Sequence, residues 1–359
     1  MMVDSRVKKL AEVVIDYSAF VKKGEIVVVS GSSTEADLIK EMYRLILKRG
    51  AYPQVDISVP GMSYIYYNNA SMDQLKKFPA FRDYIVRRSQ KYIGIGSPTN
   101  TRELSNVDPK KIAIRSKVTR PISDYIVNSK PKMHRVSMDS PTSALAQDAE
   151  MSLDEYEDFL YGACLQDWPK LAKRFRKLQS VLNKGKVFRI VGEGTDLTMR
   201  IFKNSFVVDD GHENMPGGEV FGAPEKYSAN GHIRFTYPAI RDGVEVTNIR
   251  LTFKDGKVVK ASADKNENFL KQMIAMDAGS CYIGEIGIGM NPKVTKFTKN
   301  LLFDEKIGGT IHLALGMAYK ECGEPNHSAL HWDIVKDLHK GGRVYLDGKL
   351  VLKNGKWLV

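Results

Sequence analysis

The chain has 359 residues, more than one hydrophobic core usually organises, so its length predicts two domains. With 43% hydrophobic and 27% charged residues it has an ordinary globular composition, and its three cysteines, few and widely spaced, exclude a disulfide framework and a zinc knuckle. The net charge is +12, but 30 basic residues accompany 21 acidic ones in 1–185 and 24 accompany 21 in 186–359, an interleaved pattern that disfavours a nucleic-acid-binding protein.

The beginning of the chain shows no membrane-directed segment. Charged residues are spread through MMVDSRVKKLAEVVIDYS, residues 1–18, which lacks the apolar run of a signal peptide. The rest of the sequence contains no stretch approaching the ~18 uninterrupted apolar residues of a membrane-spanning helix. We therefore expect a cytoplasmic protein without a membrane partner.

Strands and helices alternate in the first third of the chain. Apolar runs predict strands at 25–31, 52–58 and 91–97. Between the first two strands, a helical pattern begins with Ser33 or Thr34 as N-cap and ends just before Gly50. This strand–helix–strand repetition predicts a parallel sheet covered by helices on both faces.

The character of the sequence changes near residue 185. Residues 139–182 have helical periodicity, whereas the remainder alternates short apolar strands with Asp-Gly and Asn-Gly turns, and contains one helix within 264–279. We therefore predict an α/β fold class with two domains. An N-terminal parallel-sheet α/β domain would span 1–185, and a β-rich α+β C-terminal metal-binding domain would span 186–359.

Six residues with polar side chains lie in apolar or glycine-rich parts of the second half of the sequence. Taken singly, each has an ordinary structural explanation, such as a solvated carboxylate, a hydrogen-bonded core histidine or a packed tyrosine. Together they offer imidazole and carboxylate groups from strands or tight turns of one domain. The candidates are Glu219, Glu285, His312, Tyr319, His331 and Asp333.

The stretch SALHWDIV, residues 328–335, reads as a buried strand that carries two of these candidates. Because strand side chains alternate between faces, His331 and Asp333 share one face, while Trp332 lies on the other. A His–Asp hydrogen-bonded couple and a metal site both explain such a pair. The additional candidates favour the metal site.

Mixed imidazole and carboxylate ligands suit zinc, cobalt or manganese. Three carboxylates would offset most of the charge of two divalent ions, which is the composition of a two-metal hydrolase. Neither GxSxG nor HExxH occurs in the sequence, which argues against a serine hydrolase elbow and excludes a thermolysin-like helix.

Several ordered motifs of the second half closely resemble the thermophilic metallo-aminopeptidase family, that of aminopeptidases T and S. The first half adds a similar segment, PTSALAQDAEMSLDEYEDFLYGAC at 141–164. The matching stretches of the second half are GEGTDLTMRI, NMPGGEVFGAP, EIGIGMNP, FDEKIGGTIHLALG and HWD, which cover most of 187–335 in the order of the family.

The resemblance implies a dimeric enzyme that removes N-terminal residues from peptides with two divalent metal ions. It places the active-site tyrosine on Tyr319 and the metal ligands on Glu219, Glu285, His312, His331 and Asp333. We expect Glu285 to be shared by both ions, with Glu219 as the alternative bridge. The segment 320–330 is shorter than in other members of the family, so this border of the site departs from the family pattern.

Three other functions compete with this interpretation. A relative of the same fold is a mononuclear iron ring-cleaving dioxygenase, for which a 2-His-1-carboxylate set is sufficient. The presence of both Glu219 and Glu285 favours two metal ions instead. A non-catalytic binding scaffold would have lost a ligand, and a nucleic-acid-binding protein would have a denser basic surface.

Overall fold

The computed structural model describes residues 4–129 and 131–358, and the chain divides into two compact units. The first unit contains the residues up to Gln166 together with Gly211–Pro216, and the second contains Asp167–Asp210 and the residues from Gly217 onward. Helix α9 (Trp168–Lys184) thus clusters with the second unit. The predicted domain limits of 1–185 and 186–359, which place this helix in the first domain, stay a prediction.

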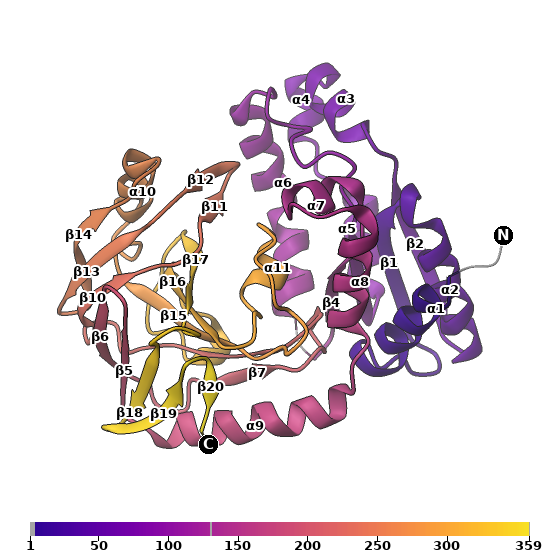
Figure 1. The fold of residues 1–359 in the computed structure, drawn as a ribbon. Helices are drawn as coiled ribbons and strands as arrows, with labels where there is room; N and C mark the ends of the chain where they lie inside the picture. The colour runs from indigo at the N-terminus through magenta and orange to yellow at the C-terminus, as the bar shows by residue number, and fades with distance from the viewer. Residues whose placement is uncertain (1–3, 130, 359) are drawn as a thin grey trace. The chain divides into compact units, whose positions relative to one another are not determined.

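A five-stranded parallel sheet with the strand order β2-β1-β3-β4-β8 forms the centre of the first unit, with helices packed beside it (Figure 1). Val27, Val28 and Val29 of β1 are buried, as the apolar run predicts. The elements of this unit are α1 (Ser5–Glu12), the π-helical turn η1 (Val13–Ser18), β1 (Ile26–Ser32), the 3-10 turn η2 (Ser33–Glu35), α2 (Ala36–Lys48), β2 (Tyr52–Ser58), α3 (Met62–Asn69), α4 (Met72–Lys76), α5 (Ala80–Arg88), β3 (Lys91–Gly96), α6 (Pro109–Asn128), β4 (His134–Asp139), α7 (Ser143–Asp148), α8 (Leu153–Cys164) and β8 (Asn214–Met215).

The start of the first predicted helix differs in detail from the sequence-based expectation. Ser33 and Thr34 lie in the 3-10 turn η2, and the hydroxyl of Ser32 caps this turn by accepting a hydrogen bond from the Thr34 N–H. The α-helix proper begins at Ala36. The prediction of Ser33 or Thr34 as N-cap was wrong, because both residues lie in the 3-10 turn that separates β1 from the α-helix.

Antiparallel sheets dominate the second unit, in the orders β14-β13-β10-β6-β5-β18-β19-β20, β17-β16-β15-β9-β7 and β11-β12. In addition to α9, its elements are β5 (Val187–Gly192), β6 (Thr195–Arg200), β7 (Val207–Asp209), β9 (Glu219–Gly222), β10 (Asn230–Arg234), β11 (Ala239–Arg241), β12 (Val244–Val246), β13 (Arg250–Lys254), β14 (Lys257–Ser262), α10 (Glu267–Ile274), β15 (Ile283–Gly289), α11 (Leu301–Asp304), β16 (Thr310–Gly316), the 3-10 turn η3 (Lys320–Cys322), β17 (His331–Asp337), β18 (Arg343–Leu346), β19 (Lys349–Lys353) and β20 (Lys356–Trp357). The predicted fold class, parallel α/β followed by a β-rich part, is confirmed.

Three Asp-Gly and Asn-Gly pairs, at 255–256, 347–348 and 354–355, form hairpin turns, as the sequence predicts. Asp255 and Gly256 connect β13 to β14, and both have positive φ angles, as a type I′ turn requires. Residues 347–348 and 354–355 do the same between β18, β19 and β20.

Strand β17 begins at His331, three residues later than the predicted strand. The preceding residues bind a side chain instead of a neighbouring strand, since Asp277 accepts hydrogen bonds from the Ser328 hydroxyl and the Ala329 N–H.

All three cysteines are buried, and none of them forms a disulfide bond in the described part of the chain. Among the described residues, no helix combines the length and the apolar character needed to cross a bilayer.

Candidate metal centre

The five predicted metal ligands lie on one face of the sheet β17-β16-β15-β9-β7. Directly opposite residues of paired strands point to the same side, and the observed pairs are Glu219–Gly289, Gly287–His312, Glu285–Ala314, Ala314–Asp333 and Gly316–His331. Each of these polar residues thus has a glycine or alanine opposite it on one neighbouring strand, while His312 also faces Val335 and Glu219 also faces Asp209. Small partners leave room above the sheet for the imidazole and carboxylate groups to converge.

Glu219 is brought to this face by the Pro-Gly-Gly turn before β9. Gly218 has a φ of +121°, and a Cβ added there would lie 2.6 Å from the Cβ of Asn291, so only glycine fits. The Gly218 N–H donates to the Asp209 carbonyl, and its own carbonyl accepts from the Met290 N–H. Both contacts fix the start of the strand that carries Glu219.

His312 occupies the space that a side chain at Gly287 would fill. A Cβ at Gly287 would lie 1.7 Å from His312 Nε2. The imidazole is fully buried, and its Nε2 lies 3.1 Å from Glu285 Oε1 and 3.4 Å from Glu219 Oε2. The glycine in the EIGIG stretch thus makes the histidine position possible.

His331 is oriented by a backbone hydrogen bond. Its Nδ1–H donates to the Met317 carbonyl at 2.9 Å, so Nε2 is the ring nitrogen that would bind a metal. That Nε2 lies 3.4 Å from Asp333 Oδ2 and 3.9 Å from Glu285 Oε2. The sequence-based pairing of His331 and Asp333 on one strand face agrees with this geometry.

The ligand atoms form two clusters that share Glu285. Glu219, Glu285 and His312 offer one cluster, and Glu285, His331 and Asp333 the other, with the atoms of each cluster within 4.8 Å of one another. Several buried side-chain atoms of the same residues have no hydrogen-bond partner within the described chain: Glu219 Oε2, Glu285 Oε2, His312 Nδ1 and Asp333 Oδ1. Of these, Glu219 Oε2 is directed at His312 Nε2 and Glu285 Oε2 at His331 Nε2. Divalent cations fit here, because a bound cation would satisfy these oxygens.

The buried carboxyl and imidazole groups on this face shift one another's pKa values. Burial raises the pKa values of the Glu219 and Glu285 carboxyls. Burial alone would lower the pKa of His312, but its hydrogen bond with Glu285 and the nearby carboxylates raise that pKa to about 9. Burial likewise opposes the charged form of Asp333, yet the His331 imidazolium lowers its pKa to about 2. The face therefore favours positive charge, supplied by protons or by cations.

Tyr319, the sixth candidate, lies beside the second cluster. It follows β16, and its ring packs on His331 with 4.7 Å between the ring centroids and edge-to-face on Phe221 at 6.0 Å. Burial and the Glu285 carboxylate raise the pKa of Tyr319, so the phenol stays protonated at neutral pH.

Sequence reasoning missed a buried lysine next to Glu219. The Lys306 ammonium, fully buried, lies 3.6 Å from Glu219 Oε1 and 3.7 Å from Asp209 Oδ2, and it also pairs with Glu305. It holds one oxygen of Glu219 and leaves the other directed at His312. A lysine within the apolar, glycine-rich stretch KIGGTIHL was the available signal.

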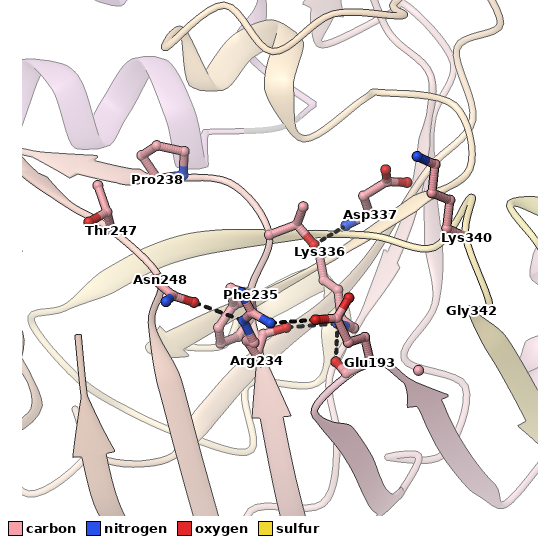
Figure 2. A pocket seen from close by; sticks show the side chains of 12 residues that line it. Glu193, Arg234, Phe235, Pro238, Thr247, Asn248, Lys336, Asp337, Lys340 and Gly342 are labelled. Carbon is pink, nitrogen blue, oxygen red and sulfur yellow. Dashed lines mark hydrogen bonds and ion pairs between the residues drawn. The ribbon is translucent and has the colours of Figure 1, made fainter. Parts of the chain in front are cut away.

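The opposite face of β17 carries a second buried lysine, which faces away from the clusters. The Lys336 ammonium donates to the backbone carbonyls of Arg234, at 2.7 Å, and Glu193, at 3.3 Å. Figure 2 shows these residues beside a pocket of about 410 Å³, where Arg234 is held between Asn248 and Glu193. Because its donors engage backbone carbonyls, we interpret Lys336 as a link between strands.

Comparison with known proteins identifies the family to which this chain belongs. The family described as thermophilic metalloprotease (M29) matches residues 3–357. The chain is a member of the M29 family. The predicted resemblance to the aminopeptidase T and S family is thereby confirmed.

Individual relatives of the M29 chain agree with this assignment. Aminopeptidase AmpS of Bacillus subtilis is 26% identical to this chain over 401 aligned residues. The alignment covers 97% of each of the two proteins. The solved structure of wild-type AmpT from Thermus thermophilus has the same fold over 100% of both chains, with a TM-score of 0.86 at 20% identity.

A dioxygenase shares the architecture more distantly. The 2,5-dihydroxypyridine dioxygenase from Pseudomonas putida KT2440 aligns over 100% of this chain and 99% of its own, with a TM-score of 0.63 and 12% identity. At this identity the likeness concerns the fold alone.

Proposed function

We propose that this chain is a metal-dependent aminopeptidase that hydrolyses the N-terminal peptide bond of peptides with two divalent ions. The observation that carries the proposal is the shared position of Glu285 between two ligand clusters on one buried sheet face. Membership of the M29 family and the names of the relatives support the reaction class.

The geometry supports a specific division of the ligands. Glu219 and His312 would hold one ion, His331 and Asp333 the other, and Glu285 would contribute one oxygen to each. Glu285 Oε1 is directed at His312 and Oε2 at His331, which favours Glu285 over Glu219 as the shared ligand. Zinc, cobalt and manganese all suit this mixture of imidazole and carboxylate.

The chemistry divides between the ions and the protein. Bound divalent ions lower the pKa of a water molecule and polarise a peptide carbonyl. Tyr319, protonated and packed against His331, would donate a hydrogen bond to the developing oxyanion or to the leaving amine. The carboxylates of the face would attract the free α-amine of the peptide, which restricts the reaction to the chain end.

Two wider properties belong to the same proposal. We expect a homodimer, on the ground of the family resemblance, and light scattering at micromolar concentration should give twice the chain mass. A cytoplasmic location is supported by three buried cysteines that form no disulfide with one another, because a reducing compartment keeps thiols from oxidising.

Metal analysis combined with a substrate panel tests the function. The protein, loaded with zinc, cobalt or manganese, should contain two ions per chain and hydrolyse aminoacyl p-nitroanilides. Chelation should abolish the activity, and added metal should restore it.

The dioxygenase alternative rests on the shared fold and on the presence of two histidines and a carboxylate in the site. It predicts one iron per chain, oxygen consumption with a dihydroxylated aromatic ring and no peptide hydrolysis. That combination of results would replace the aminopeptidase proposal.

A further inference from the structure

A small recess with a mixed lining of apolar and charged side chains adjoins the metal-facing surface of β17. Its volume is about 40 Å³, and Asp333, a candidate ligand, forms part of its wall. Lys299 and Asp304 complete the lining, and the Asp304 carboxylate already accepts hydrogen bonds from Thr298. The apolar lining residues are Pro238, Ala239, Ile240, Phe297, Leu301 and Val335.

The first wall of the recess continues directly from the ligand cluster. His331, Asp333 and Val335 alternate along β17 onto one face, with about 6.6 Å between successive members of the row. Two positions supply ligands, and the third supplies a buried apolar side chain. Along this face of β17, the side chains thus change from candidate metal ligands to an apolar residue between one position and the next.

The second wall is fixed to the first by hydrogen bonds. The N–H groups of Thr236 and Tyr237 both approach the Val335 carbonyl at 3.3 Å, and the Arg241 guanidinium donates to the His331 carbonyl at 2.8 Å. Segment 238–240 is therefore held at both ends beside β17.

The third wall belongs to the loop between β15 and α11. Phe297 stacks on Tyr237 with 4.8 Å between ring centroids and an interplanar angle of 3°. Asp304 accepts hydrogen bonds from the N–H and hydroxyl of Thr298, at 2.7 and 2.9 Å, which fixes the loop behind this ring. The recess is thus built from three restrained segments.

We infer that this recess receives the side chain of the N-terminal residue of the substrate and selects short aliphatic side chains. The inference rests on the proposed aminopeptidase function. In that reaction the scissile carbonyl is bonded to the Cα that carries this side chain, so its pocket must lie next to the metal ligands. The recess beside Asp333 meets that requirement.

The size of the recess defines the substrate class. One water molecule needs about 10–15 Å³ of such volume, so 40 Å³ accommodates roughly three methyl-sized groups. Valine and leucine side chains match this space, whereas an aromatic ring exceeds it. The lining carries two carboxylates, Asp304 and Asp333, against the one ammonium of Lys299, so an aspartate side chain would be repelled.

A substrate series measures this selectivity. For p-nitroanilides of glycine, alanine, valine, leucine, phenylalanine, aspartate and lysine, kcat/KM of the metal-loaded enzyme should peak at valine or leucine. These two should exceed glycine, phenylalanine and aspartate by at least about tenfold. A flat series, or a preference for a charged or aromatic residue, would overturn the inference.

Substitutions at Ile240, which is half-buried, test the recess itself. Ile240→Ala enlarges the space, so the kcat/KM ratio of phenylalanine to valine should rise at least about tenfold. Ile240→Trp fills the space, so the ratio of leucine to alanine should fall by a similar factor. Leu350→Ala removes the same number of carbons from a more exposed site on β19 and should change neither ratio.

A binding measurement removes the dependence on turnover. Saturation-transfer NMR should show the methyl groups of free L-leucine in contact with the wild type and with Leu350→Ala, but not with Ile240→Trp, and L-aspartate should give no signal. Hydrolysis with unchanged ratios and unchanged L-leucine contacts in both Ile240 variants overturns the recess alone. Absence of hydrolysis of every substrate, with metal bound, overturns the aminopeptidase function and the recess together.

Discussion

At the scale of single residues, successive side chains of β17 point to opposite faces of the sheet, so candidate metal ligands alternate with core residues. His331 and Asp333 face the ligand clusters, whereas Trp332 is 3% exposed on the other face and packs edge-to-face against Phe269. Neighbouring residues in the sequence therefore have different tasks. Substitutions at adjacent positions should affect different properties of the protein.

Asp333→Asn preserves the shape of the side chain but removes the charge that would hold a cation. We expect the metal affinity of the second cluster and kcat to fall at least about 100-fold, since even changes to residues behind the ligands cost about 10–100-fold. Trp332→Phe should instead lower the free energy of unfolding by about 1–3 kcal/mol and spare metal binding. Metal content and thermal unfolding of both variants distinguish these effects. Full occupancy and normal turnover of Asp333→Asn would leave a plain His–Asp couple as the explanation.

Gly287 is required by the ring that lies above it. In Gly287→Ala the new Cβ would meet His312 Nε2 at 1.7 Å, so the imidazole must move away from Glu219 and Glu285. We expect loss of one of the two proposed ions and a lower melting temperature. Gly162→Ala is the matched control, because a Cβ at this position of α8 meets no atom within 4 Å. Equal metal content in the two variants would contradict the assigned role of Gly287.

At the scale of elements, the register of the sheet β17-β16-β15-β9-β7 aligns the four strands that carry the proposed ligands. Its other face is anchored to neighbouring strands, in part through Lys336, which connects β17 to the end of β10 and the turn after β5. The position of β17, and hence of His331 and Asp333, depends on such anchoring.

Lys336→Met leaves two backbone carbonyls without their donor, which should cost about 1–3 kcal/mol of unfolding free energy. The cost should depend on pH. Burial lowers the pKa of Lys336 to about 8 from an ordinary 10.5, so between these values the unfolded chain holds a proton that the folded chain has released. Wild-type stability relative to the variant should therefore rise as the pH increases from 8 to 10.5. Denaturant unfolding across this range measures the difference, and a pH-independent difference contradicts the shifted pKa.

At the scale of the whole molecule, metal binding should contribute to stability as well as to activity. Three buried carboxylates and two imidazoles converge on one face, so cations that bind there stabilise the folded chain. At a free metal concentration 100 times Kd, the gain is about 2.7 kcal/mol per site. Addition of a chelator should lower the melting temperature, and zinc, cobalt or manganese should restore it, whereas magnesium should not. An unchanged melting curve would show that the clusters do not bind metal in the folded protein.

The sequence by itself determined the features that depend on local physics. The apolar run of β1, the Asp-Gly turn at 255–256 and the common face of His331 and Asp333 follow from propensity, turn geometry and the period of two. The choice of ligand residues came from the same local contexts, helped by ordered motifs shared with a known family.

Only the tertiary structure decided what depends on contacts between distant segments. The pairing of β9, β15, β16 and β17 brings Glu219 within 3.4 Å of His312, although 93 residues separate them in sequence. The same pairing places Lys306 against Glu219 and forms the recess at Val335 from three separate segments. Strand register across such distances is selected by the packing of the whole sheet, so no local pattern specifies which residues meet.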